Sequence, residues 1–169
     1  ILDCRFKLGD ENYGVNSYKK EHIENAVLID FEKELTGEIK EHGGRHPLPD
    51  IREFAENMEK HGVNDSRDII IYDDGDLAGA ARLWWIFKYI GKNNVYVLDG
   101  GLTAWKNEGY KTTDKKPEII KNNEKLTVNI QEKILCDMEC VKSKHSDKNV
   151  ILVDSKASER YLGLTEPVD

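Results

Sequence analysis

Residues 69–75 read Ile69-Ile70-Ile71-Tyr72-Asp73-Asp74-Gly75, a short apolar run that ends in two acidic residues and a glycine. Three of its residues are β-branched, which favours extended backbone. A continuous apolar run of this length is typical of a strand buried on both faces of a parallel sheet. The stretch therefore predicts a central strand over residues 69–73, with a turn immediately after it.

The sequence on both sides of this strand alternates between short apolar runs and helical patterns. Further strands are predicted at residues 1–4, 26–30 and 95–99. Apolar residues at helical spacing, each followed by a glycine, predict helices over residues 50–60, 78–90 and 102–108. Strands that alternate with helices at this spacing predict an α/β domain with a mostly parallel sheet flanked by helices.

The character of the chain changes after residue 109. Residues 110–123 are rich in Lys, Thr, Asn and Glu and contain Pro117, which predicts a linker. Beyond it we expect an extended segment at 126–129, a helix at 137–145 and a strand at 150–154. The strand Val150-Ile151-Leu152-Val153-Asp154 repeats the opening Ile1-Leu2-Asp3, which indicates an internal duplication.

These patterns predict three parts: an N-terminal domain at 1–109, a linker at 110–123, and the beginning of a second, similar domain at 124–169. The chain opens directly on a predicted strand without an initiator Met, and it stops just after the first strand of the second unit. We therefore expect the chain to be a fragment whose second core is incomplete.

The charge balance limits the classes of partner. The 169 residues carry 25 Lys and Arg against 32 Asp and Glu, a formal net charge of -7. A negative field of this size argues against nucleic acid or an anionic membrane as the main partner. No apolar run approaches the roughly 18 residues that span a bilayer.

Several motifs together resemble the two-domain rhodaneses, the family of thiosulfate and 3-mercaptopyruvate sulfurtransferases. They occur in the family's order and cover nearly the whole chain. One departure is Glu24-Asn25, where the family usually has Pro-Gly. The motifs are Tyr18-x3-His22-Ile23-x2-Ala26-x2-Ile29, Gly44-Arg45-His46-Pro47-Leu48-Pro49, Tyr72-Asp73-Asp74-Gly75 with Ala80-Ala81-Arg82-Leu83-Trp84-Trp85, Val97-Leu98-Asp99-Gly100-Gly101-Leu102-x2-Trp105, and Val153-Asp154-Ser155-x4-Arg160-Tyr161-x-Gly163-x2-Glu166-Pro167.

The resemblance implies a function for the full-length protein. In the family, a cysteine takes the outer sulfur of thiosulfate as a persulfide and passes it to cyanide or a thiol, without a cofactor. 3-Mercaptopyruvate is a second donor that the resemblance allows. The nucleophile follows the central strand, and here that position holds Asp73. The resemblance therefore implies a non-catalytic first domain and a catalytic cysteine in a second-domain loop that is absent from this chain.

The resemblance assigns one substrate-binding residue, Arg160, which matches the family's arginine for the anionic donor. The alternative is a structural arginine paired with Glu159 or Glu166. Lys156 stands where the family often has Arg, and it either supports the site or is a solvated lysine.

Two other classes of function remain open. Asp73 in place of cysteine favours a non-catalytic module that binds partners or regulates another enzyme. A phosphatase of the rhodanese-related type needs a cysteine and a longer loop ending in Arg, and residues 73–80 contain no cysteine.

Three cysteines, Cys4, Cys136 and Cys140, are an odd and sparse set. They argue against a disulfide scaffold and indicate a reducing compartment, so we expect a cytoplasmic protein. Cys4 ends a predicted strand and should be buried and inert. Cys136, Cys140 and His145 give three potential metal ligands where a structural zinc site needs four, so we expect no metal. His22 and the tryptophans Trp84, Trp85 and Trp105 are interpreted as structural.

Overall fold

The computed structural model describes residues 1–42, 44–119 and 124–166. It divides into two compact units, Ile1–Gln131 and Glu132–Asp169, which we describe separately. Within the described ranges, no helix has both the length and the apolar character that crossing a bilayer requires.

The first unit is built on a parallel sheet of four strands. The strands are β1 (Leu2–Asp3), β2 (Val27–Leu28), β3 (Ile69–Tyr72) and β4 (Val95–Val97). Their order is β2-β1-β3-β4, and every pair is parallel. The four predicted strands and the α/β class are confirmed, although each strand is shorter than its apolar run.

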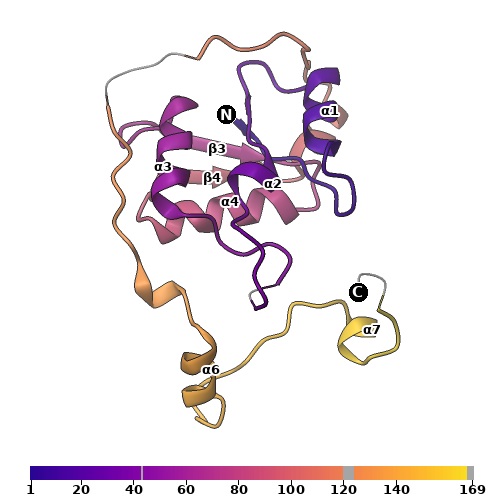
Figure 1. Cartoon of the computed structure of the whole chain (residues 1–169). Coiled ribbons are helices and arrows are strands. Elements are labelled where there is room, and N and C mark those ends of the chain that lie inside the picture. The colour runs from indigo at the N-terminus through magenta and orange to yellow at the C-terminus, as the bar shows by residue number, and fades with distance from the viewer. Residues whose placement is uncertain (43, 120–123, 167–169) are drawn as a thin grey trace. The chain divides into compact units, whose positions relative to one another are not determined.

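Helices lie beside the sheet, as Figure 1 shows. They are α1 (Tyr13–Lys20), α2 (Phe31–Glu34), α3 (Ile51–Lys60), α4 (Ala78–Tyr89) and α5 (Gly101–Asn107). The three predicted helices correspond to α3, α4 and α5. Asp50 is the N-cap residue of α3, and its carboxylate accepts hydrogen bonds from the backbone N–H groups of Arg52 and Glu53.

The two faces of the sheet carry separate apolar clusters. The larger one places Ile69 and Ile71 against α3 and α4, through residues such as Phe54 and Phe87. A smaller cluster on the other face joins Tyr72 to Leu102 of α5. Alternate residues of a strand point to opposite faces, so β3 contributes to both clusters.

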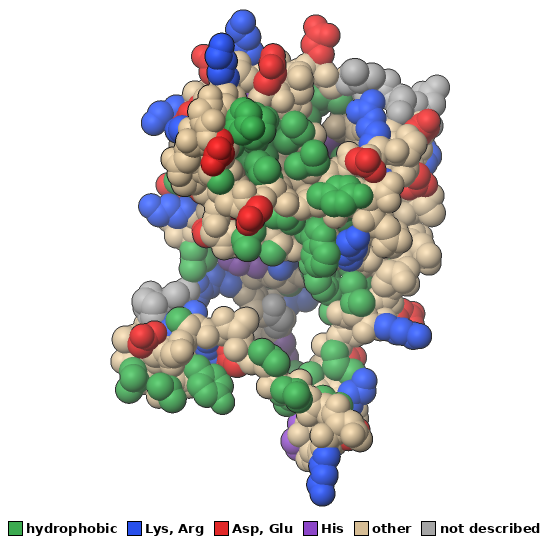
Figure 2. Space-filling view, turned by 180° about the vertical axis from the view of Figure 1, so that it is seen from behind, with side chains coloured by type: hydrophobic (Ala, Val, Ile, Leu, Met, Phe, Trp, Pro, Cys, Tyr) green, Lys and Arg blue, Asp and Glu red, His purple; other side chains and the backbone are tan. Residues whose placement is uncertain are grey.

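The prediction that the β3 stretch is buried on both faces is only partly correct. Ile70 and its register partner Tyr96 on β4 expose 42% and 56% of their surface. Helix α5 packs near the carboxyl end of that face, beside Tyr72, and leaves the other end open. The space-filling view shows hydrophobic side chains at the surface of the first unit (Figure 2).

The predicted start of the second part at residue 124 differs from the observed division after Gln131. Leu126 is buried in the main core of the first unit, and the backbone N–H of Asn129 donates to the carbonyl of Ile90. Part of the predicted linker also pairs with this unit, because Thr113 forms an antiparallel bridge with His22. Residues 120–123 of the predicted linker lie outside the described residues.

The second unit contains a 3-10 turn (Glu132–Ile134) and the helices α6 (Met138–Lys144) and α7 (Ser158–Tyr161). Helix α6 confirms the predicted helix, and Asp137 is its N-cap residue. The segments 126–129 and 150–154, predicted to be extended, form no strand in the described chain. A strand needs a hydrogen-bonded neighbour, and Ile151 and Val153 instead expose 85% and 84% of their surface.

The cysteine prediction is half correct. Cys4 is fully buried, as expected, and its Sγ–H donates to the carbonyl of Gly79 at 3.2 Å. Cys136 and Cys140, by contrast, are joined in a disulfide. The low cysteine count was a poor guide here, because a four-residue spacing brings the two Cα atoms to 5.5 Å, within the range that a disulfide allows.

Candidate functional site at the carboxyl end of the sheet

The carboxyl ends of β1 and β3 bring four charged residues together. Asp3 ends β1 and is followed by Arg5, while Asp73 and Asp74 follow β3. Parallel strands end at the same edge of a sheet, and ligands of open α/β sheets bind at that edge. The loop between β3 and α4, where the resemblance places the nucleophile, therefore lies at a position suited to chemistry.

Asp73 is buried and turned into its own loop. One carboxylate oxygen accepts a hydrogen bond from the backbone N–H of Gly75 at 2.8 Å, and the other accepts from Ala80 at 3.0 Å. Only 2% of the residue is exposed. The N–H groups that would stabilise an anion in this loop are thus already bound to the carboxylate of Asp73.

Helix α5 closes over the same loop. The backbone N–H of Leu102 donates to the carbonyl of Asp73 at 2.8 Å. Gly101 has a φ of +55°, and a Cβ there would lie 2.4 Å from the carbonyl oxygen of Asp73. The close approach of α5 therefore requires glycine at this position.

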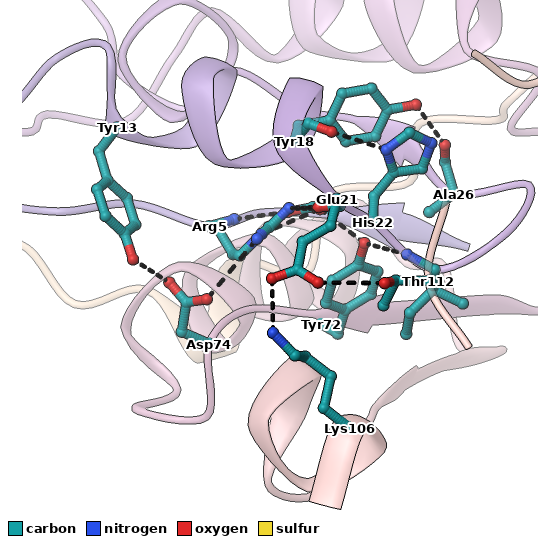
Figure 3. A network of polar contacts seen from close by, with 12 residues as sticks. Arg5, Tyr13, Tyr18, Glu21, His22, Ala26, Tyr72, Asp74, Lys106 and Thr112 are labelled. Carbon is teal, nitrogen blue, oxygen red and sulfur yellow. Dashed lines mark hydrogen bonds and ion pairs between the residues drawn. The ribbon is translucent and has the colours of Figure 1, made fainter. Parts of the chain in front are cut away.

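Asp3, Arg5 and Tyr72 form a buried polar cluster beside this loop. Figure 3 shows Arg5 and Tyr72 within the wider network of polar contacts. The guanidinium of Arg5 donates to both carboxylate oxygens of Asp3, at 2.8 to 3.1 Å, and to the backbone carbonyl of Glu21 at 2.6 Å. The hydroxyl of Tyr72 donates to Asp3 at 2.6 Å and accepts from the N–H of Ile23 at 3.1 Å. Burial, reinforced by Asp3, raises the pKa of Tyr72 far above its usual value.

A second layer of contacts lines an open cleft next to this cluster. The hydroxyl of Tyr13 donates to Asp74 at 2.8 Å, and Arg5 lies 3.9 Å from the other oxygen of that carboxylate. Burial raises the pKa of Asp74 despite these two contacts. On the other side, the Lys106 ammonium donates to Glu21 at 2.6 Å and holds the pKa of that carboxyl below its usual value. Arg5, Tyr13, Glu21, Asp74 and Lys106 all line the cleft.

The residues that the sequence singled out lie in different units. Asp73 belongs to the first unit and Arg160 to the second. In the structure Arg160 donates through Nε to Glu166 at 3.0 Å, the pairing that the structural alternative for this residue expected. Its role in binding an anionic substrate stays a prediction.

The sequence analysis did not predict that Asp3, Arg5 and Tyr72 form one cluster. The signal was present, because the Asp-x-Arg step at 3–5 is repeated as Asp-x-Lys at 154–156. In both places the backbone N–H two residues on donates to the aspartate, at 3.1 Å for Arg5 and 2.9 Å for Lys156. The repeated turn is consistent with the predicted internal duplication.

His22 is fully buried, as the structural interpretation expects. Its ring stacks on Tyr18, with 3.9 Å between ring centroids. The two ring nitrogens lie 2.7 Å from the carbonyl of Tyr18 and 3.0 Å from that of Lys115. His22 therefore fixes α1 and the segment after residue 110 to each other.

Comparisons with known proteins agree with this fold. The family model described as "Rhodanese-like domain" matches residues 1–108. A "Probable 3-mercaptopyruvate sulfurtransferase" of Pseudomonas aeruginosa is 35% identical over an alignment of 171 positions, which covers 100% of this chain and 60% of the relative. A bovine "Thiosulfate sulfurtransferase" is 31% identical over an alignment of 175 positions, which covers 99% of this chain and 55% of the relative.

Among solved structures, a 3-mercaptopyruvate sulfurtransferase of Escherichia coli superposes with a TM-score of 0.82 at 26% identity. The match covers 95% of this chain and 60% of that structure. The fold and the loop after β3 thus define a rhodanese-type α/β domain. The chain belongs to the rhodanese-like family, and it spans less than two thirds of the length of these relatives.

Proposed function

We propose that the full-length protein is a sulfurtransferase that moves sulfane sulfur from thiosulfate to cyanide or a thiol. The transfer would use a cysteine persulfide in the second domain and need no cofactor. Support comes from the family and from relatives that are named as sulfurtransferases. The partners in this proposal are small anionic donors and acceptors, with neither nucleic acid nor membrane involved.

The geometry of Asp73 is the observation that supports assigning the chemistry to the second domain and not to the first. Its carboxylate stands directly after β3 and accepts the N–H groups of Gly75 and Ala80. A carboxylate in that place offers no sulfur to form a persulfide, and its charge repels an anionic donor. The first domain is therefore proposed to be non-catalytic, with Arg160 binding the donor in the second.

A second donor is favoured by a specific observation. The Pseudomonas relative and the Escherichia coli structure are both named for 3-mercaptopyruvate as the substrate. Initial rates of the full-length protein with each donor at equal concentration distinguish the two. A higher kcat/KM with thiosulfate supports the leading proposal, and a higher value with 3-mercaptopyruvate replaces it with the alternative.

Arg160→Lys and Arg160→Ala variants of the same protein test the proposed role of that arginine. A binding role predicts a raised KM for the donor, smaller for the Lys variant because Lys keeps the charge but loses the bidentate geometry. An unchanged KM with lowered stability would instead assign Arg160 to its pair with Glu166.

The alternative from another class is a non-catalytic rhodanese-like module that binds or regulates a partner. Asp73 in place of cysteine is the observation in its favour. If the full-length protein transfers no sulfur from either donor, this alternative takes the place of the enzymatic proposal. A cytoplasmic location is also part of the leading proposal, and cell fractionation tests it.

A further inference from the structure

Cys136 and Cys140 belong to the second unit and are not among the residues that the proposed function uses. They form a disulfide that closes a short ring around Asp137, Met138 and Glu139. Cys136 is exposed and Cys140 is half-buried. Both sulfur atoms thus belong to residues that solvent reaches, which is the condition for exchange with a dissolved thiol or disulfide.

The third cysteine differs in every respect. Cys4 is fully buried in the core of the first unit and donates to the carbonyl of Gly79. Burial raises the pKa of its thiol well above the usual value, so it is protonated and unreactive at neutral pH. The chain therefore contains one inert thiol and one accessible pair, which makes the pair easy to measure on its own.

The disulfide constrains the first turn of α6, and the N-cap residue Asp137 stabilises the same turn. The carboxylate of Asp137 accepts from the backbone N–H of Cys140 at 2.8 Å. Among the described residues of the second unit, none is buried. Apolar packing therefore contributes little to this part of the chain, and the ring and the cap are the contacts that hold the start of α6.

We propose that Cys136 and Cys140 are a reversible redox pair, a site of thiol modification by low-molecular-weight disulfides such as glutathione disulfide. The thiolate of exposed Cys136 attacks one sulfur of the small disulfide, which forms a mixed disulfide and releases one thiolate. The thiolate of Cys140 then attacks the Cys136 sulfur, which closes the ring and releases the second thiolate. Two cysteine thiols are oxidised to one disulfide and one small disulfide is reduced to two thiols. The two protons lost by the cysteines are taken up by the two released thiolates, so no net proton is released.

The proposal predicts that the redox state changes the order of α6 and leaves the first unit unaffected. Lys142 and Lys144 lie in α6, so trypsin reports on that helix. Trp84, Trp85 and Trp105 all belong to the first unit, so tryptophan fluorescence reports on that unit alone. Reduction should increase the rate of cleavage at the two lysines several-fold, with the fluorescence unchanged.

Thiol counting on the 169-residue chain tests the pair directly. After incubation with glutathione disulfide, a maleimide should label no cysteine under native conditions. After reduction and removal of the reductant, it should label two, and a third only when the protein is unfolded. In the Cys4→Ala variant, the additional cysteine that is labelled on unfolding should be absent. The numbers labelled under native conditions, none after oxidation and two after reduction, should not change.

Single variants identify the intermediate. Cys140→Ser with glutathione disulfide should hold one glutathione on Cys136, visible by mass spectrometry, because the second attack is blocked. Two freely labelled thiols after incubation with excess glutathione disulfide would overturn the proposal. So would a disulfide that excess dithiothreitol fails to reduce while the fluorescence remains native. Neither result depends on whether the full-length protein transfers sulfur.

Discussion

At the scale of single residues, the carboxyl end of the sheet is a set of buried charges that are all paired. Asp3 is bound by Arg5 and Tyr72, and Asp73 by two backbone N–H groups. A buried charge is tolerated only when such partners replace water. If one partner is removed, the remaining charge stays buried without a hydrogen-bond partner, and the folded state is destabilised. These residues therefore connect the loop after β3 to the core of the fold.

Tyr72→Phe tests this coupling. The change removes a hydrogen bond to Asp3 and leaves the N–H of buried Ile23 without its acceptor. We expect the free energy of unfolding to fall by about 1–3 kcal/mol, measured by urea denaturation. The matched control is Tyr96→Phe on the neighbouring strand, where the side chain is exposed and the change should stay within about 0.5 kcal/mol. Equal effects of the two variants would contradict this account of the cluster.

At the scale of elements, the sequence predicted what depends on local pattern. The apolar run at 69–73, the helical spacing at 50–60 and the glycine after it were sufficient to predict β3 and α3. Burial was harder to predict, because Ile70 and Ile71 are the same residue type and differ only in which face of the sheet is covered. The exposure of Ile70 depends on where α5 packs, which is a tertiary property that the run itself does not contain.

The site was predicted to a similar degree. Asp73 directly follows the central strand, as the local motif predicted, and its identity with the family's nucleophile position stays a prediction. The contacts among Arg5, Tyr13 and Asp74 join residues far apart in sequence, and only the parallel register brings them to one edge. The packing of residues 124–131 on the first unit was not predicted for the same reason. The sequence of this polar segment gives little indication that Leu126 is buried.

Gly101→Ala tests the close approach of α5 to the loop after β3. The new Cβ would meet the carbonyl of Asp73, and the residue would also have to keep a left-handed backbone. Gly109→Ala is the matched control, because its φ is +79° but nothing lies within 4 Å of the added atom. We expect the control to lose about 1–2 kcal/mol from conformation alone and Gly101→Ala to lose clearly more, measured by urea denaturation. Equal losses would show that the steric contact is unimportant.

Two carboxylates help hold residues 124–131 against the rest of the first unit, together with buried Leu126 and the hydrogen bond from Asn129 to Ile90. Glu59 accepts from the backbone N–H of Leu126, and Asp65 accepts from the backbone and hydroxyl of Thr127. These hydrogen bonds lower the pKa of each carboxyl below its ordinary value, 4.5 for Glu59 and 3.8 for Asp65. A carboxyl whose pKa is lowered on folding stabilises the folded state above the ordinary pKa, and this contribution is lost as the pH falls through the lowered value.

We therefore expect the segment to be docked at neutral pH and to detach below about pH 4. Hydrogen exchange followed by NMR should show the amides of Leu126 and Thr127 losing protection at a higher pH than those of β3. Asp65→Asn should reduce protection of Thr127 already at neutral pH. Loss of protection in the segment and in β3 at the same pH would mean global unfolding and would contradict local detachment.

At the scale of the whole molecule, the chain combines one well-packed unit with one that has little packing of its own. The first unit holds the clusters around Ile71 and Tyr72, whereas Ile151 and Val153 of the second are almost fully exposed. The repeated Asp-x-basic turn supports the proposal that the second unit begins another rhodanese-like domain. In the proposed function, the chemistry then belongs to that domain.

The most direct test of this division is thiocyanate formation from thiosulfate and cyanide by the 169-residue chain. The account predicts no turnover above the uncatalysed rate, because Asp73 directly follows β3 and the proposed function assigns the catalytic cysteine to a loop of the second domain. The full-length protein should turn over, and its rate should survive Asp73→Asn. Turnover by the 169-residue chain that is lost on replacing Cys4, Cys136 or Cys140 would contradict the placement of the active site.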